Sequence, residues 1–170
     1  MFKRALALAL IGFAASGCGP SLSTYVKPEA PWGAIKRVAV LPFALPSENP
    51  VQRDLATHLF CEELRNTHRV EVVEVSSSSA QPVAGGAWDI RKVGKDYQAD
   101  AVVSGSVDDM NGTVIHMQVQ DVATEELLWS GTYLLGVRSE FFSFKTQQQQ
   151  FKNGFRWLSK QFASDSASSS

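Results

Sequence analysis

The chain has 170 residues, a formal net charge of −1 and two cysteines. This length suits one domain, and the near-neutral charge lacks the electrostatic footprint of a nucleic-acid-binding protein. Two cysteines do not make the disulfide framework that holds small secreted folds together. We therefore expect a single domain without such a framework and without a nucleic-acid partner.

The N-terminal residues have the pattern of a secretory signal peptide. Lys3 and Arg4 precede an apolar run, Ala5–Ala15, that is too short to span a bilayer as a helix. The ending Ala15-Ser16-Gly17-Cys18 resembles the lipobox of bacterial lipoproteins. This resemblance implies cleavage after residue 17 and acylation of Cys18 on its sulfur and on its new amine. The alternative is an ordinary signal peptide that happens to precede a cysteine.

Lipidation would fix the mature chain to a membrane. Each buried methylene group contributes about 0.8 kcal/mol, so two or three acyl chains on Cys18 would anchor the protein durably. An aspartate after the lipidated cysteine usually retains enterobacterial lipoproteins at the inner membrane, and this chain has Gly19 there. The resemblance therefore implies anchoring at the outer membrane, facing the periplasm. Loss of residues 1–17 removes Lys3 and Arg4, which changes the net charge from −1 to −3.

The mature chain is predicted to have three parts. Residues 18–34 are predicted to form a flexible tether, because prolines and small polar residues keep such a segment extended. Trp32, near its end, is a candidate for docking on the domain. Residues 35–163 are predicted to form a single α/β domain, and residues 164–170, which are small and polar, a disordered tail.

Hydrophobic periodicity predicts the elements of the domain. Strands are expected over residues 36–43, 69–75, 100–107, 113–121 and 127–135, and helices over residues 50–66 and 87–98. A last helix is expected to begin at Ser139 or Ser143 and to bury one face formed by Phe144, Phe151, Phe155, Leu158 and Phe162. We therefore predict a mixed five-stranded sheet in the order strand-helix-strand-helix-strand-strand-strand-helix, with helices packed on it. The two earlier helices are expected to cover one face and the last helix the other.

Three motifs carry a resemblance to a known fold. They are Arg37–Phe43, the segment Val93–Val107, and the pair of segments Val119–Asp121 and Leu127–Ser130. They resemble the opening strand, the second helix with its following strand, and the last hairpin of the TolB amino-terminal domain and its relatives. Those relatives include the curli secretion lipoprotein CsgG and the penicillin-binding-protein activator LpoB. The resemblance implies the fold described above, and the chain is too short for the membrane-inserting hairpins of CsgG.

Residues capable of catalysis or metal binding are scattered. His58, His68 and His116 have no second ligand at the helical spacing typical of metal sites. The acids at the predicted strand ends are expected to be solvated, the alternative being that they gather at one edge and bind a cation. These acids are Asp108, Asp109, Asp121, Glu125 and Glu126. Cys61 is expected to be an inert, partly shielded thiol, the alternative being a redox role. No nucleophile elbow and no phosphate-binding glycine loop is present in the sequence, so we expect no enzyme, no cofactor and no metal.

Two phenylalanines are candidates for contact with a partner. Phe141 and Phe142 lie just before the last helix and outside its apolar stripe, where exposed aromatic side chains would mark a binding site. The alternative is that both belong to the core. Together with the lipobox, they predict a lipoprotein that binds an envelope protein during cell-envelope assembly or that regulates an envelope enzyme. The second possibility is an accessory subunit of an outer-membrane secretion or transport apparatus.

Overall fold

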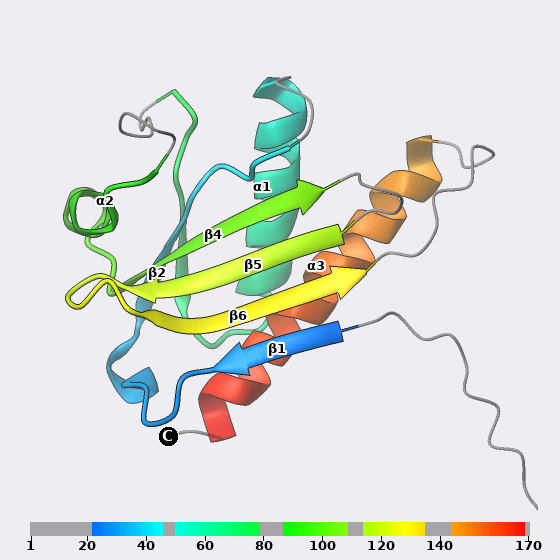
Figure 1. Ribbon diagram of the computed structural model, residues 1–170. Helices are drawn as coiled ribbons and strands as arrows, with labels where there is room; N and C mark the ends of the chain where they lie inside the picture. Colours follow the sequence, from blue (N-terminus) through cyan, green and yellow to red (C-terminus); the bar gives the residue numbers. More distant parts are fainter. Residues whose placement is uncertain (1–21, 46–49, 79–86, 109–113, 135–143, 169–170) are drawn as a thin grey trace, which may run out of the picture.

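A six-stranded sheet forms the centre of the fold (Figure 1). The computed structural model describes residues 22–45, 50–78, 87–108, 114–134 and 144–168. The strand order is β1-β6-β5-β4-β2-β3, in which β3, β2 and β4 are parallel and the neighbours from β4 to β1 are antiparallel. The class is mixed α/β, as predicted. The elements are β1 (Leu22–Val26), η1 (Trp32–Ala34), β2 (Arg37–Val40), α1 (Pro50–Arg65), β3 (Glu71–Glu74), α2 (Ile90–Tyr97), β4 (Ala101–Asp108), β5 (Val114–Asp121), β6 (Leu127–Leu134) and α3 (Phe144–Ser168).

The sixth strand comes from the segment that was predicted to be a tether. β1 pairs antiparallel with β6, with Leu22 opposite Tyr133 and Val26 opposite Trp129. The tether prediction is therefore wrong for Leu22–Val26, which is rich in β-branched and aromatic residues and contains no proline. Trp32 does dock on the domain: its side chain is 5% exposed and meets the ring of Phe162 edge-on, with 5.7 Å between the ring centroids.

The helices cover the two faces of the sheet in a different way from that predicted. α1 and α3 pack together behind the sheet in Figure 1, whereas α2 lies on the opposite face against Ala39, Leu41 and Val102. The prediction that the two earlier helices share a face is therefore wrong. The reason is connection handedness: the chain passes from β2 to β3 in one direction and from β3 back past β2 to β4 in the other. Since parallel crossovers are right-handed, the two helices must lie on opposite faces.

The main core lies between the sheet and the pair α1 and α3. Phe43, Phe60 and Phe155 form an aromatic cluster, with centroid separations of 5.2, 5.2 and 5.7 Å. Beside it, Glu63 of α1 is 3% exposed and accepts hydrogen bonds from Arg156 of α3, at 3.0 Å from Nε and 3.2 Å from Nη2. The Glu63 carboxylate and its hydrogen bonds raise the pKa of Arg156. This charged pair fixes how α3 packs on α1.

α3 buries most of the apolar stripe that the sequence predicted, apart from Phe144, whose side chain is outside those that the structure describes. Phe155, Leu158 and Phe162 are fully buried, and Phe151 is half-buried. The helix continues to Ser168, so the prediction of a disordered tail is wrong for residues 164–168, which form the end of the helix. They are held by Trp129 of β6, whose indole Nε1 donates to Asp165 Oδ2 at 2.9 Å. No helix in the described ranges combines the length and hydrophobicity that crossing a membrane requires.

Candidate functional site

One face of the sheet is only partly covered by a helix among the described residues. α2 packs over β2 and the start of β4, and no helix of the described ranges lies over the face of β5, β6 and β1 on the same side (Figure 1). Alternate residues of neighbouring strands stand in two rows across this side, as the pairing register requires. We call these rows the open face; they are Ser106–His116–Thr132–Ser23 and Ser104–Gln118–Ser130–Tyr25.

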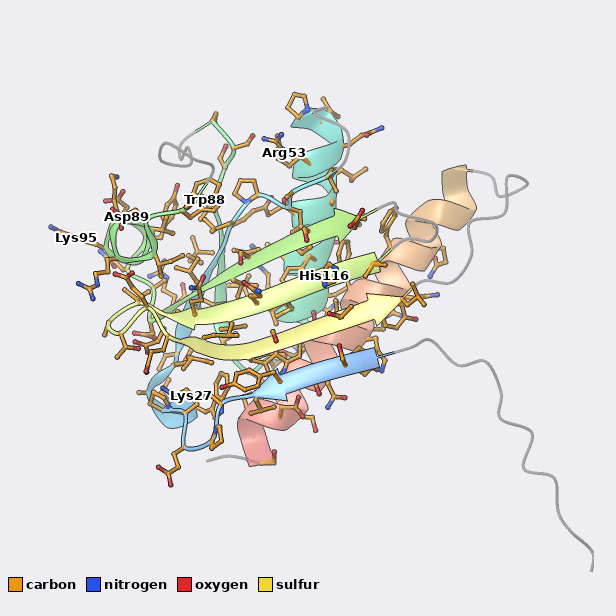
Figure 2. All side chains as sticks on the ribbon, viewed as in Figure 1. Lys27, Arg53, Trp88, Asp89, Lys95 and His116 are labelled. Atoms are coloured by element: carbon orange, nitrogen blue, oxygen red, sulfur yellow. The ribbon has the colours of Figure 1, made fainter. Side chains whose placement is uncertain are left out.

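The open face is polar: it carries hydroxyl, amide, tyrosine and histidine side chains and no Asp, Glu, Lys or Arg. His116, in the middle of β5 (Figure 2), is exposed, and its Nδ1 lies 3.0 Å from Thr132 Oγ1. Tyr25, on the edge strand, is 46% exposed, and among the described residues only Val51 and Leu55 are other large hydrophobic side chains that are exposed. Hydroxyl, amide and tyrosine side chains on a rigid sheet suit hydrogen-bonded contact with another protein surface.

The candidate residues named from the sequence for lipid attachment and partner binding are not among those that the structure describes. Cys18 lies in the range 1–21, and Phe141 and Phe142 lie in the range 135–143. The roles assigned to these three residues remain predictions.

Cys61 is more deeply enclosed than the sequence indicated. It lies on the inner face of α1, fully buried in the main core, and is a free thiol. Burial raises the pKa of this thiol to about 12, and the nearby carboxylate of Glu74 acts in the same direction. A thiol with so little tendency to ionise is poorly suited to act as a nucleophile or a redox group.

The acidic residues at the β5–β6 turn are bound to groups of the same chain. Glu126 pairs with Lys27, and this hydrogen-bonded lysine lowers the pKa of Glu126. Glu125 pairs with Arg91 Nε at 2.6 Å, and Asp121 Oδ1 accepts from Thr124 N at 2.7 Å. Within the described ranges no group of three or more His, Cys, Asp or Glu side chains could hold a metal ion. The turn carboxylates therefore connect the β5–β6 turn to the end of β1 and to α2, and close the turn itself.

The other two histidines are separated from the open face and from each other. His58 lies between two carboxylates, with Nδ1 at 3.2 Å from Glu74 and Nε2 at 3.7 Å from Glu62. His68 follows α1 with a positive φ of 54°. The structure thus brings none of the three histidines together.

Sequence reasoning missed the contribution of β1 to the open face. Ser23 and Tyr25 were assigned to the tether, because prolines on both sides outweighed the five residues between them. The available signal was composition, because Thr24, Tyr25 and Val26 are residue types that favour strands.

Comparison with known proteins shows similarity in fold. The structure resembles PelC from Paraburkholderia phytofirmans, crystallised as a dodecamer, with a TM-score of 0.59 and 14% identity over 82% of this chain and 94% of that chain. A variant of the PelC dodecamer from the same organism matches with a TM-score of 0.56 and 14% identity, over 83% and 99% of the two chains. At this level of identity the likeness shows a shared fold.

The likeness to other proteins is lower. The LpoB C-terminal domain from Salmonella enterica, one of the proteins that the sequence motifs resemble, aligns with a TM-score of 0.43 and 19% identity, over 58% of this chain and 81% of that one. That likeness is too low to support an argument. No protein-family model matches the sequence, and no curated protein does.

Proposed function

We propose that this chain is a lipid-anchored protein of the bacterial cell envelope that acts by binding other protein subunits and not by catalysis. The lipobox-like sequence ending at Cys18 supports the anchor, and Gly19 after it supports the outer membrane, facing the periplasm. The polar open face supports a role in protein contact. The lack of a nucleophile–base motif in the sequence, with Cys61 buried and un-ionised, supports a non-enzymatic role.

The anchor would hold the domain close to the bilayer. Cys18 precedes Leu22, the first residue of β1, by four positions. An extended chain spans at most about 3.6 Å per residue, so the start of β1 would lie within about 14 Å of the Cα atom of Cys18. The end of the sheet where β1 begins and where β4 and β6 finish would therefore face the membrane.

The protein subunits that this chain binds are, in the favoured version of the proposal, other copies of itself, which assemble into a homo-oligomer at the membrane. The observation that carries it is the fold shared with PelC, which crystallises as a dodecamer and aligns over nearly its whole chain. This form corresponds to an accessory subunit of an outer-membrane secretion or transport apparatus. The other form is a monomer that binds a different envelope protein, through the open face or through Phe141 and Phe142.

The two forms differ in the mass of the purified protein. We expect the lipidated full chain, extracted in mild detergent, to form a defined oligomer by light scattering and a ring by negative-stain microscopy. Tyr25→Arg and Gln118→Arg introduce charges on the open face and should reduce the oligomer, whereas Lys95→Glu on the exposed side of α2 (Figure 2) should not. A monomer at all concentrations would contradict the oligomeric form, and crosslinking in the native envelope would then identify the client.

A further inference from the structure

Two large apolar side chains on α1 are exposed to solvent. Val51 is 73% exposed and Leu55 is 39% exposed, and they lie one turn apart near the start of the helix. His58 and Glu62, further along the helix, are also exposed. Because these four residues are spaced by four, three and four positions, they lie on one side of α1. We call them the α1 stripe; its first half is apolar and its second half is polar.

The α1 stripe and the open face lie on opposite sides of the molecule. α1 packs behind the sheet, against the main core, whereas the open face is on the side of α2 (Figure 1). Tyr25, the other exposed large hydrophobic residue of the described ranges, belongs to the open face. The exposed hydrophobic side chains are therefore divided between two opposite surfaces.

A ring of identical subunits needs two such surfaces. In a closed ring of more than two copies, every contact joins two different patches, whereas a patch that meets itself gives only a dimer. The homo-oligomer proposed above uses the open face, so the neighbouring copy must present a different surface to it. α3, the other helix behind the sheet, exposes polar and charged side chains, which include Asn153, Arg156 and Lys160. Since charged residues are depleted at the centre of protein interfaces, the α1 stripe is the better partner.

We propose that the α1 stripe of one copy packs on the open face of the next copy, in a head-to-tail contact. This inference rests on the proposed homo-oligomer and names its second surface. The apolar half of the stripe contacts Tyr25 of the next copy, a residue type that often dominates binding energy. The polar half contacts the serine, threonine and glutamine side chains of the open face.

The two surfaces are similar in length. A helix rises about 1.5 Å per residue, so the stripe from Val51 to Glu62 extends over about 16 Å. Each row of the open face crosses four strands. At about 4.8 Å between neighbouring strands, a row spans about 14 Å. The stripe and a row can therefore be in contact over most of their length.

A head-to-tail contact also keeps the anchored ends of all copies together. The open face and the α1 stripe lie on the two sides of the sheet, so the contact leaves the end at which β1 begins uncovered. Rotation about an axis normal to the membrane repeats the contact and keeps that end of each copy toward the bilayer. If Cys18 is lipidated as proposed above, every copy in the ring can remain anchored.

Two variants, each blocked on one side, test this contact in the lipidated full chain. Tyr25→Arg places a charge on the open face, and Leu55→Arg places one on the α1 stripe. By light scattering in mild detergent, each variant alone should lose the oligomer and behave as a monomer. An equimolar mixture should form a heterodimer, because one chain retains an intact stripe and the other an intact open face. Lys160→Glu, which alters an exposed residue of α3, is the matched control and should keep the oligomer.

The outcomes separate this contact from the oligomer itself. If the unmodified chain forms an oligomer and either variant keeps its mass, the head-to-tail contact is overturned and the oligomer stands. Two monomeric variants that do not dimerise when mixed would also overturn it, because the two surfaces would not meet each other. A monomeric unmodified chain would refute the homo-oligomer, and this inference with it. Circular dichroism checks that the variants are folded, and Val51→Arg, at a more exposed position, replaces Leu55→Arg if that chain is not.

Discussion

At the scale of single residues, burial in α1 keeps the Cys61 thiol protonated. Its pKa rises from 9.0 to about 12. Because only the thiolate reacts with alkylating agents, the reactive fraction at mildly alkaline pH falls on the order of a thousandfold. We expect iodoacetamide to modify Cys61 on the order of a thousandfold more slowly in the folded chain than in urea. Mass spectrometry can follow the reaction. Rapid labelling of the folded chain would contradict this burial, and Cys61→Ala should preserve function.

A second residue-scale prediction concerns the ion pair between Lys27 and Glu126. The folded pKa of Glu126 is lowered, so the pair contributes stability above the unfolded value of about 4.3, and this stability is lost as the pH falls through the folded pKa. Glu126→Gln should therefore lower the melting temperature slightly at pH 7 and leave it unchanged in strong acid. The effect should be small, because both side chains are solvent-accessible.

The control for this pair is Glu29→Gln, which changes an exposed acid nearby. Its melting temperature should follow that of the unmodified chain at both pH values. Equal effects of Glu126→Gln at pH 7 and in strong acid would show that the substitution acts through something other than the charge on Glu126.

At the scale of elements, β1 should contribute measurably to stability. It supplies the outer hydrogen-bonded ladder of β6, and Val26 packs against the main core. Replacing Leu22–Val26 by glycine and serine should lower the melting temperature by at least about 2–4 °C, the shift that about 1 kcal/mol produces in a domain of this size. Replacing Ser76–Ser78 by glycine should have little effect. An unchanged melting temperature in the β1 variant would mean that this segment behaves as the tether first predicted.

Phenylalanines on α3 and just before it should differ in whether they contribute to stability or to binding. Phe155 is fully buried against Phe43 and Phe60, so Phe155→Ala should cost about 3–5 kcal/mol. The double variant Phe141→Ala, Phe142→Ala should instead weaken partner binding or assembly more than it lowers the melting temperature. Thermal unfolding and light scattering on both proteins test this. A large fall in melting temperature for the double variant, with binding intact in its folded fraction, would assign both residues to the core.

Strong periodicity made most elements predictable from the sequence. The apolar run Val38–Leu41 predicted a buried strand, which is β2. The alternation of His116, Met117 and Gln118 predicted a strand with one exposed face, which is β5. β1 was missed because it is short, lies between prolines, and is defined by a partner strand far along the chain. Local patterns do not report such a partner, and the faces taken by α1 and α2 likewise depend on strand order.

The candidate sites were less predictable than the fold, for a related reason. The open face needs the register of four strands, and two of its residues lie on β1. Of the candidate site residues, only Cys18 lies in a local sequence motif, the lipobox-like ending of the predicted signal peptide.

At the scale of the whole molecule, the proposed anchor would decide where the protein acts. Cys18→Ser removes the only thiol at the predicted cleavage site, so it should abolish acylation and leave the chain soluble or uncleaved. Labelling with a fatty-acid probe, followed by separation of the membrane and periplasmic fractions, measures both effects. The Cys61→Ala variant should label normally and serves as the control. Equal label in the Cys18→Ser variant would rule out the lipid anchor.

The pairing of β1 with β6 also sets an order of events in folding. The earliest strand in the chain bonds to one that is synthesised almost last, with Leu22 opposite Tyr133. If the chain is exported N-terminus first, β1 waits as an unpaired strand at the membrane surface until β6 has crossed. Closing so long a loop is entropically slow, and an unpaired strand invites pairing with other chains. If Cys18 is lipidated as proposed, the interval between lipidation and the arrival of β6 is when β1 is most open to pairing with other chains.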